Sequence, residues 1–188
     1  MTNIYFVRHA ESDNNVHDDM NRPLTKKGFN DRSLVFDYFK NIEVSAVFSS
    51  PYKRAYDTVA ELAAKKGLDV VCIDAFKERR IDGWIEDFWA YSKRQWDDFD
   101  YKILSGESLR ETQSRNIEAL HELLSSRCDE TIVVGTHGTA LSTIINYFDN
   151  TFSYERFAKI VGSMPWIVHF VFDGDKCLSV NPINPFDF

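Results

Sequence analysis

An uninterrupted apolar run at residues 131–135 (TIVVG) is the feature that most constrains the fold. A strand without alternating polar positions is typical of a parallel sheet that helices cover on both faces. Polar residues follow at once, as Thr136-His137-Gly138, and lead into a helical pattern that extends to Phe148. This order of elements predicts an α/β fold around a central sheet.

Similar short runs predict the other strands, at residues 3–7, 44–48, 69–73, 165–172 and 176–180. Helical patterns between them predict helices at residues 25–40, 50–66 and 107–127. Thr25 is expected to cap the first helix, and Ser50 and Pro51 to open the second. We therefore expect a three-layer sandwich, in which a mostly parallel central sheet has helices on both faces.

The stretch 74–105 differs from the rest of the chain because it mixes many aromatic residues with carboxylates. We interpret it as a mostly helical excursion over the active-site edge of the sheet. The tail, 181–188, is expected to be coil. A length of 188 residues favours a single domain over residues 1–188, including this excursion.

Composition narrows the classes of function. The net charge is −7 at pH 7, whereas binding to a nucleic-acid backbone needs a basic face, so we expect no nucleic-acid partner. The three cysteines are far apart and have no metal-ligand spacing. The start, MTNIYFVRHA, has no basic segment before a long apolar run, and no apolar stretch is long enough to cross a bilayer. We expect a cytoplasmic protein without a membrane partner.

Three loops that follow predicted strands carry the reactive side chains: Arg8-His9, Ser49-Ser50 and Thr136-His137-Gly138. The carboxyl ends of parallel strands meet at one edge of a sheet, which is where ligands bind. An arginine fork matches two phosphate oxygens, a neutral imidazole can attack phosphorus, and a protonated one can donate to a phosphoryl oxygen. With Arg54, these residues indicate a phosphate pocket that needs no metal. Each of them alone is as readily explained as a structural residue.

Five motifs in order resemble those of the histidine phosphatase superfamily, the phosphoglycerate-mutase-like proteins. They are Val7-Arg8-His9-Ala10-Glu11-Ser12 with Asn15, Pro23-Leu24-Thr25-Lys26-Lys27-Gly28, Ser49-Ser50-Pro51-Tyr52-Lys53-Arg54-Ala55, Gly106-Glu107-Ser108-Leu109 and Thr136-His137-Gly138. The resemblance extends from residue 3 to residue 145. It departs from the family pattern at Ala10, where the family usually has Gly, and at Asp57, where an amide is common.

The resemblance implies a role for each matching residue. His9 would be the nucleophile and form a phosphohistidine. Arg8, Arg54 and His137 would bind the phosphoryl oxygens and stabilise the transition state, with Asn15 and Gly138 as further contacts. Glu78 follows the third strand, where the family keeps its proton donor. Family members often have a Gly four residues after this acid, whereas Gly83 lies five residues after Glu78. The register of the loop therefore leaves Asp82 and Glu86 as alternative acids. Some of Trp84, Phe88 and Trp89 are expected to touch the organic part of the substrate.

We therefore expect a histidine acid-phosphatase-like phosphomonoesterase, which hydrolyses a small phosphorylated substrate without a cofactor or metal. A phosphoglycerate mutase is the alternative within the same fold, although we expect so short a chain to lack the closing elements that a mutase needs. A non-catalytic module that binds a phosphate ligand or a protein is the alternative from another class. The identity of the substrate and the oligomeric state cannot be read from the sequence.

Overall fold

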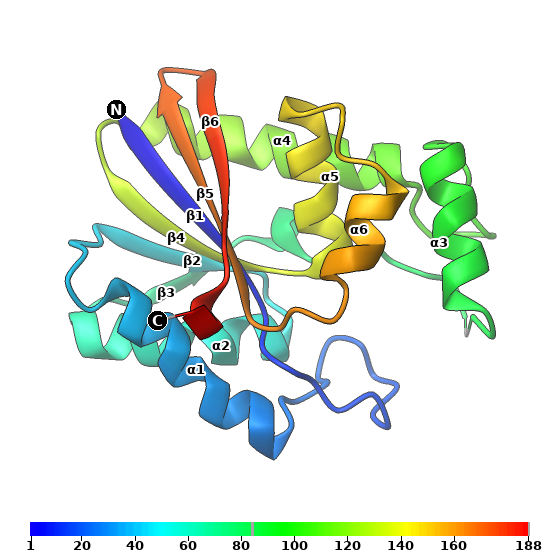
Figure 1. Ribbon diagram of the computed structural model, residues 1–188, viewed down its shortest axis with the longest axis horizontal. Coiled ribbons are helices and arrows are strands. Elements are labelled where there is room, and N and C mark those ends of the chain that lie inside the picture. The colour runs from blue at the N-terminus through cyan, green and yellow to red at the C-terminus, as the bar shows by residue number, and fades with distance from the viewer. Residues whose placement is uncertain (84, 188) are drawn as a thin grey trace.

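The structure is a computed structural model that describes residues 1–83 and 85–187 (Figure 1). Its six strands form one sheet with the order β3-β2-β4-β1-β5-β6. The strands are β1 (Thr2–Arg8), β2 (Ala46–Ser49), β3 (Val70–Cys72), β4 (Thr131–Thr136), β5 (Trp166–Asp173) and β6 (Lys176–Ile183). The first four are parallel to one another, and β5 and β6 join β1 as an antiparallel extension.

Helices cover both faces of this sheet, which confirms the predicted three-layer α/β fold. They are α1 (Lys26–Phe39), α2 (Lys53–Lys66), α3 (Phe88–Asp97), α4 (Leu109–Ser126), α5 (Gly138–Phe148) and α6 (Tyr154–Ile160). Figure 1 shows α1 and α2 on one side of the strands and α4 and α5 on the other. A hydrophobic core lies on each face of the sheet, and β1 contributes side chains to both. Ile4 and Phe6 face α4 and α5, whereas Tyr5 and Val7 face α1 and α2.

Local chemistry explains where several helices begin and end. The Thr25 side chain accepts a hydrogen bond from the Gly28 N–H, as predicted for the cap of α1. Gly67 ends α2 in the left-handed conformation that glycine adopts without strain. Gly28 also lets α1 approach the strand-end loop, since a Cβ atom there would lie 2.0 Å from the Glu11 carbonyl oxygen.

Some predicted boundaries are wrong. Helix α2 begins at Lys53 with Tyr52 as its N-cap, not at Ser50 and Pro51, and the Ser50 hydroxyl lies against His137. Strand β6 extends to Ile183 through Pro182, which an edge strand tolerates, so the start of the tail is not coil. A short 3₁₀ turn, Pro185–Asp187, follows it.

The described residues of the excursion, 74–83 and 85–105, contain less helix than predicted, since they form only a 3₁₀ turn, Asp74–Phe76, and the ten-residue α3. Helix α3 packs on α6, a helix that the sequence analysis did not predict. The ring of Trp96 lies 5.7 Å from that of Phe157. Figure 1 shows α3 beyond α6, on the side toward which β4 ends. No helix within residues 1–83 and 85–187 has the length and apolarity to cross a bilayer. The single-domain organisation and the cytoplasmic location stay predictions.

Candidate active site

His9 lies at the carboxyl end of β1, which is paired on both sides, with β4 and with β5. Its backbone N–H donates to the Thr136 carbonyl, at 3.0 Å, and the next N–H, that of Ala10, donates to the Thr58 hydroxyl, also at 3.0 Å. The side chain is only 7% exposed. The end of β1, β4 and α2 together hold this imidazole in place.

The hydrogen bonds of His9 determine its tautomer. Nδ1 lies 2.7 Å from the Ala10 carbonyl oxygen, which can only accept, so Nδ1 carries the proton. Nε2 keeps its lone pair and accepts from Arg54 Nε at 3.3 Å. Burial, followed by the charges of Arg54 and Arg8, lowers the pKa of His9 well below 6.5. The imidazole is therefore neutral, with an unprotonated nitrogen, as a nucleophile requires.

His137 lies directly before α5 and faces His9, with 5.3 Å between the ring centroids and 61° between the ring planes. Nε2 is 2.7 Å from Ser50 Oγ, and this oxygen accepts a hydrogen bond from the Tyr52 N–H. Nδ1 is buried and has no hydrogen-bond partner within the part of the chain that the structure describes.

Burial and the charge of Arg54 lower the pKa of His137 well below 6.5, so this imidazole is neutral, not protonated as the phosphate chemistry suggested. A neutral imidazole still donates from one nitrogen. Where the Ser50 hydroxyl donates to Nε2, the ring proton is on Nδ1, the atom without a partner. In this tautomer the Nδ1–H group of His137 has no acceptor among the described residues and is available to a ligand.

Arg8 packs over the first turn of α5. A Cβ atom on Gly138 would come within 3.1 Å of the Arg8 Cζ and Nε atoms, so glycine permits this close approach. Nη1 donates to the carbonyls of Ile160, at 2.8 Å, and Ser163, at 3.2 Å, whereas the buried Nε has no partner among the described residues. Burial lowers the pKa of Arg8 to about 10 against the opposing effect of Glu78. The guanidinium therefore stays charged near neutral pH.

Arg54 is buried on the first turn of α2 and is shared between His9 and an acidic residue that the sequence analysis did not select. The Asp19 carboxylate lies 3.1 Å from Arg54 Nη2, and the Asp19 carbonyl accepts from Nη1. Arg22 also pairs with this carboxylate, at 3.3 Å. The polar loop after β1 thus folds back onto Arg54.

Glu78 reaches the N-terminus of α5, beside His137 and Arg8. Its carboxylate accepts backbone N–H groups from Thr139 and Ala140, both at 3.0 Å, and from Arg79 at 2.8 Å. A carboxylate is favoured at this end of a helix, where the N–H groups have no partner within the helix. Glu78 is therefore held in the same corner of the fold as the two histidines.

The alternative acids lie elsewhere. Asp82 accepts from the Ser105 hydroxyl at 2.7 Å, and Glu86 is exposed. Asn15 is also exposed, and both its backbone N–H and its side-chain amide donate to Asp13 Oδ1. Among the residues that the structure describes, no hydrogen bond joins Asn15 to either histidine.

The structure thus brings together Arg8, His9, Arg54, Glu78 and His137 at one edge of the sheet. Asp19 and Thr58, which hold two of these groups, were missed as functional residues, whereas Ser50 was expected at this edge but its contact with His137 was not. The N-cap pattern gave Ser50 another explanation, and the fold-back of a loop that brings Asp19 to Arg54 has no local sequence signal.

Of the predicted aromatic contacts, Phe88 packs on Phe157 and Trp89 is 46% exposed, while Trp84 lies outside the described residues. Their contact with a substrate stays a prediction.

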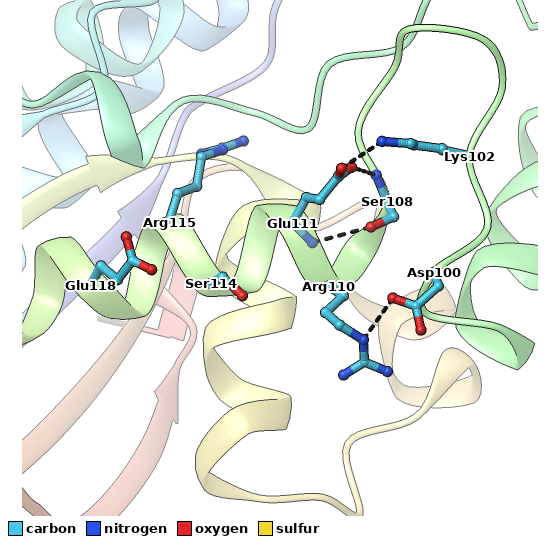
Figure 2. A pocket seen from close by; sticks show the side chains of 8 residues that line it. All are labelled: Asp100, Lys102, Ser108, Arg110, Glu111, Ser114, Arg115 and Glu118. Carbon is cyan, nitrogen blue, oxygen red and sulfur yellow. Dashed lines mark hydrogen bonds and ion pairs between the residues drawn. The ribbon is translucent and has the colours of Figure 1, made fainter.

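A surface hollow of about 430 Å³ lies along α4, and none of the residues brought together above lines it (Figure 2). It is lined by Asp100, Lys102, Ser108, Arg110, Glu111, Ser114, Arg115 and Glu118. Within residues 1–83 and 85–187, no group of three or more histidines, cysteines or carboxylates is placed to hold a metal ion.

Known proteins share both this sequence pattern and this fold. Phosphoserine phosphatase 1 from Hydrogenobacter thermophilus is 27% identical over 150 residues, which cover 73% of this chain and 71% of the relative. A probable phosphoglycerate mutase, GpmB, from Salmonella paratyphi A is 25% identical over 159 residues, which cover 78% of this chain and 74% of the relative. A phosphoserine phosphatase from Entamoeba histolytica, solved with 3-phosphoglyceric acid, superposes with a TM-score of 0.77 at 22% identity, covering 98% of this chain and 99% of that one.

The structural likeness shows a shared fold, and the family follows from the sequence itself. The sequence profile of the histidine phosphatase superfamily (branch 1) matches residues 4–182, which is nearly the whole chain. This match includes all five motifs identified above. The chain belongs to the histidine phosphatase superfamily.

Proposed function

We propose that the protein is a phosphatase that hydrolyses a small phosphomonoester through a phosphohistidine on His9. The observation that carries this proposal is the state of that imidazole: Nδ1 is bonded to the Ala10 carbonyl, and Nε2 is unprotonated and faces the second histidine and Arg54. Burial keeps this nitrogen free of a proton near neutral pH. An unprotonated imidazole nitrogen beside two guanidinium groups is suited to attack on phosphorus.

In the first step, the lone pair of His9 Nε2 forms a bond to phosphorus while the bond between phosphorus and the ester oxygen breaks. Arg8 and Arg54 stabilise the negative charge that spreads over the phosphoryl oxygens, and His137 Nδ1 donates to one of them. The acid form of Glu78 gives its proton to the departing alkoxide, which is a poor leaving group without one. The products are an alcohol and a phosphohistidine.

In the second step, a water molecule attacks the phosphorus atom and the bond to Nε2 breaks. The Glu78 carboxylate takes one proton from the water, which restores its acid form for the next cycle. The electron pair of the broken bond returns to Nε2, and inorganic phosphate leaves. No step requires a metal ion, because two guanidinium groups balance the charge of the oxyanion and the neutral imidazole of His137 donates a hydrogen bond to it.

The relatives support phosphatase activity and indicate which substrates to test first. One relative is named a phosphoserine phosphatase, and the structural neighbour binds 3-phosphoglyceric acid. The relative named a probable phosphoglycerate mutase keeps mutase activity as the second candidate. Phosphoserine, 3-phosphoglycerate and p-nitrophenyl phosphate should therefore be assayed for phosphate release, and 3-phosphoglycerate also for isomerisation.

The decisive test is replacement of the nucleophile. His9→Ala should abolish hydrolysis of p-nitrophenyl phosphate, while His121→Ala, on the outer face of α4, should retain it. The parent protein should form an acid-labile phosphoenzyme that His9→Ala lacks, and vanadate should inhibit. A His9→Ala protein with the parent rate would exclude this mechanism. Tight phosphate binding without turnover of any ester would instead favour a binding module.

A further inference from the structure

The segment that carries Glu78 is fixed by an arginine from a different layer of the fold. Arg115 projects from α4, and its Nη1 donates to the carbonyls of Ala75 and Lys77, at 2.5 and 2.9 Å. Its Nη2 donates to the carbonyl of Glu78 itself, at 3.1 Å. One guanidinium therefore holds three carbonyl groups within four consecutive residues.

Glu107 fixes this guanidinium in turn. Arg115 Nε and Nη2 lie 2.8 and 3.0 Å from the two carboxylate oxygens of Glu107, which makes the pair bidentate. Glu107 also binds the far end of the same segment. Its carboxylate accepts a hydrogen bond from the Arg80 N–H, and its backbone N–H donates to the Arg80 carbonyl, both at 2.8 Å. The segment 75–80 is thus held on both sides of Glu78.

The pair is buried enough to act as a rigid support. Each side chain is only 17% exposed, and α4 is anchored at its start by a capping box between Ser108 and Glu111. A planar guanidinium can bind one carboxylate bidentately and still donate to several carbonyls, whereas a lysine ammonium offers a single point of charge. The local geometry therefore needs arginine rather than any cation.

We propose that Arg115, locked by Glu107, is the positioning residue for Glu78 and sets where its carboxyl group lies relative to the ester oxygen of the substrate. This inference rests on the proposed role of Glu78 as proton donor. Arg115 reaches Glu78 only through the backbone, so it acts without touching the reacting atoms. Misplacing a general acid slows departure of a poor leaving group more than that of a good one.

Figure 2 supplies a matched control on the same helix. Arg115 and Arg110 leave α4 in opposite directions, and Arg110 pairs with the exposed Asp100 at 2.7 Å. Substituting Arg110 by lysine makes the same change of side chain on α4 without removing a hydrogen bond to the segment 75–80. Substituting Arg115 by lysine keeps the charge and removes the fork.

The experiment compares two esters. Hydrolysis of p-nitrophenyl phosphate, whose leaving group needs little protonation, and of phosphoserine, an alkyl ester, is measured for the parent protein, Arg115→Lys, Arg110→Lys and Glu78→Gln. We expect Arg115→Lys to lower kcat for phosphoserine roughly tenfold to a hundredfold, and kcat for the nitrophenyl ester far less. Arg110→Lys should match the parent on both esters. In the Glu78→Gln background, Arg115→Lys should cause little further loss, since both changes disable one proton donor.

Equal losses on the two esters, or losses that multiply with those of Glu78→Gln, would overturn the positioning role while leaving the proposed function intact. A parent protein that hydrolyses neither ester, or a Glu78→Gln variant without the preference for the better leaving group, would instead refute the proposed function or its proton donor. Glu107→Gln keeps the side-chain volume and removes the bidentate ion pair with Arg115. It provides the same comparison if Arg115→Lys does not fold.

Discussion

Mild acid should destabilise the fold through its two buried histidines. His9 and His137 have pKa values held well below the ordinary 6.5, by burial first and by neighbouring arginines second. In the unfolded chain both imidazoles regain their ordinary pKa. As the pH falls below that value, the unfolded state binds protons that the folded state cannot accept, so the free energy of unfolding decreases. Above that value this penalty disappears.

The size of the effect follows from the same linkage. A site that binds a proton only when unfolded loses at most about 1.4 kcal/mol of folding free energy per pH unit. Between about pH 7 and about pH 5.5, an ordinary histidine goes from mostly neutral to mostly protonated, which gives about 1 kcal/mol per buried imidazole. The two together should lower the free energy of unfolding by about 2 kcal/mol, a substantial part of the stability of a typical domain.

Urea unfolding at these two pH values provides the assay, and glutamine variants separate the histidines from the carboxylates. His9→Gln and His137→Gln should each reduce the difference between the two pH values by about 1 kcal/mol, since glutamine does not titrate. His17→Gln, at an exposed position, is the matched control and should keep the full difference. If the variants of the buried residues lost as much stability in acid as the parent, both imidazoles would have to be accessible to protons in the folded protein.

Three further predictions concern packing, the loop after β1 and metals. In thermal melts, Gly28→Ala should lower the free energy of unfolding by about 1–3 kcal/mol, because its Cβ would overlap the Glu11 carbonyl. Gly162→Ala, with open space around it, should change that free energy by less than about 0.5 kcal/mol. Asp19→Asn should strengthen inhibition by vanadate, since this carboxylate competes for Arg54; unchanged or weaker inhibition would contradict that reasoning. Dialysis against EDTA should leave phosphatase activity unchanged, and a loss restored by divalent ions would refute the metal-free mechanism.

Local patterns in the sequence predicted the strands and the residues that follow them. The apolar runs before His9 and His137 indicate buried parallel strands, and the shared carboxyl edge of such strands brings the two imidazoles together. Helix α6, by contrast, has only seven residues, too few for a clear amphipathic period. Ser50 had a sound local interpretation as an N-cap, and its contact with His137 depends on tertiary structure alone.

The choice among the three acids also needed tertiary structure. Glu78, Asp82 and Glu86 are close in sequence, but only the path of segment 75–80 decides which carboxylate reaches the N-terminus of α5. That path depends on Arg115, which is 37 residues from Glu78. Spacing along the chain carries no information about such a contact.

The position of β1 between β4 and β5 has a consequence for the motions of the protein. Strand neighbours on both sides mean that its amides can meet solvent only when much of the sheet opens, so they should exchange hydrogen slowly, as those of the neighbouring β4 should. The polar loop that follows has several exposed residues and should exchange hydrogen faster. The nucleophile is thus expected to stand on a slowly exchanging strand beside a faster loop, an arrangement that would let ligands come and go while the attacking nitrogen stays aligned.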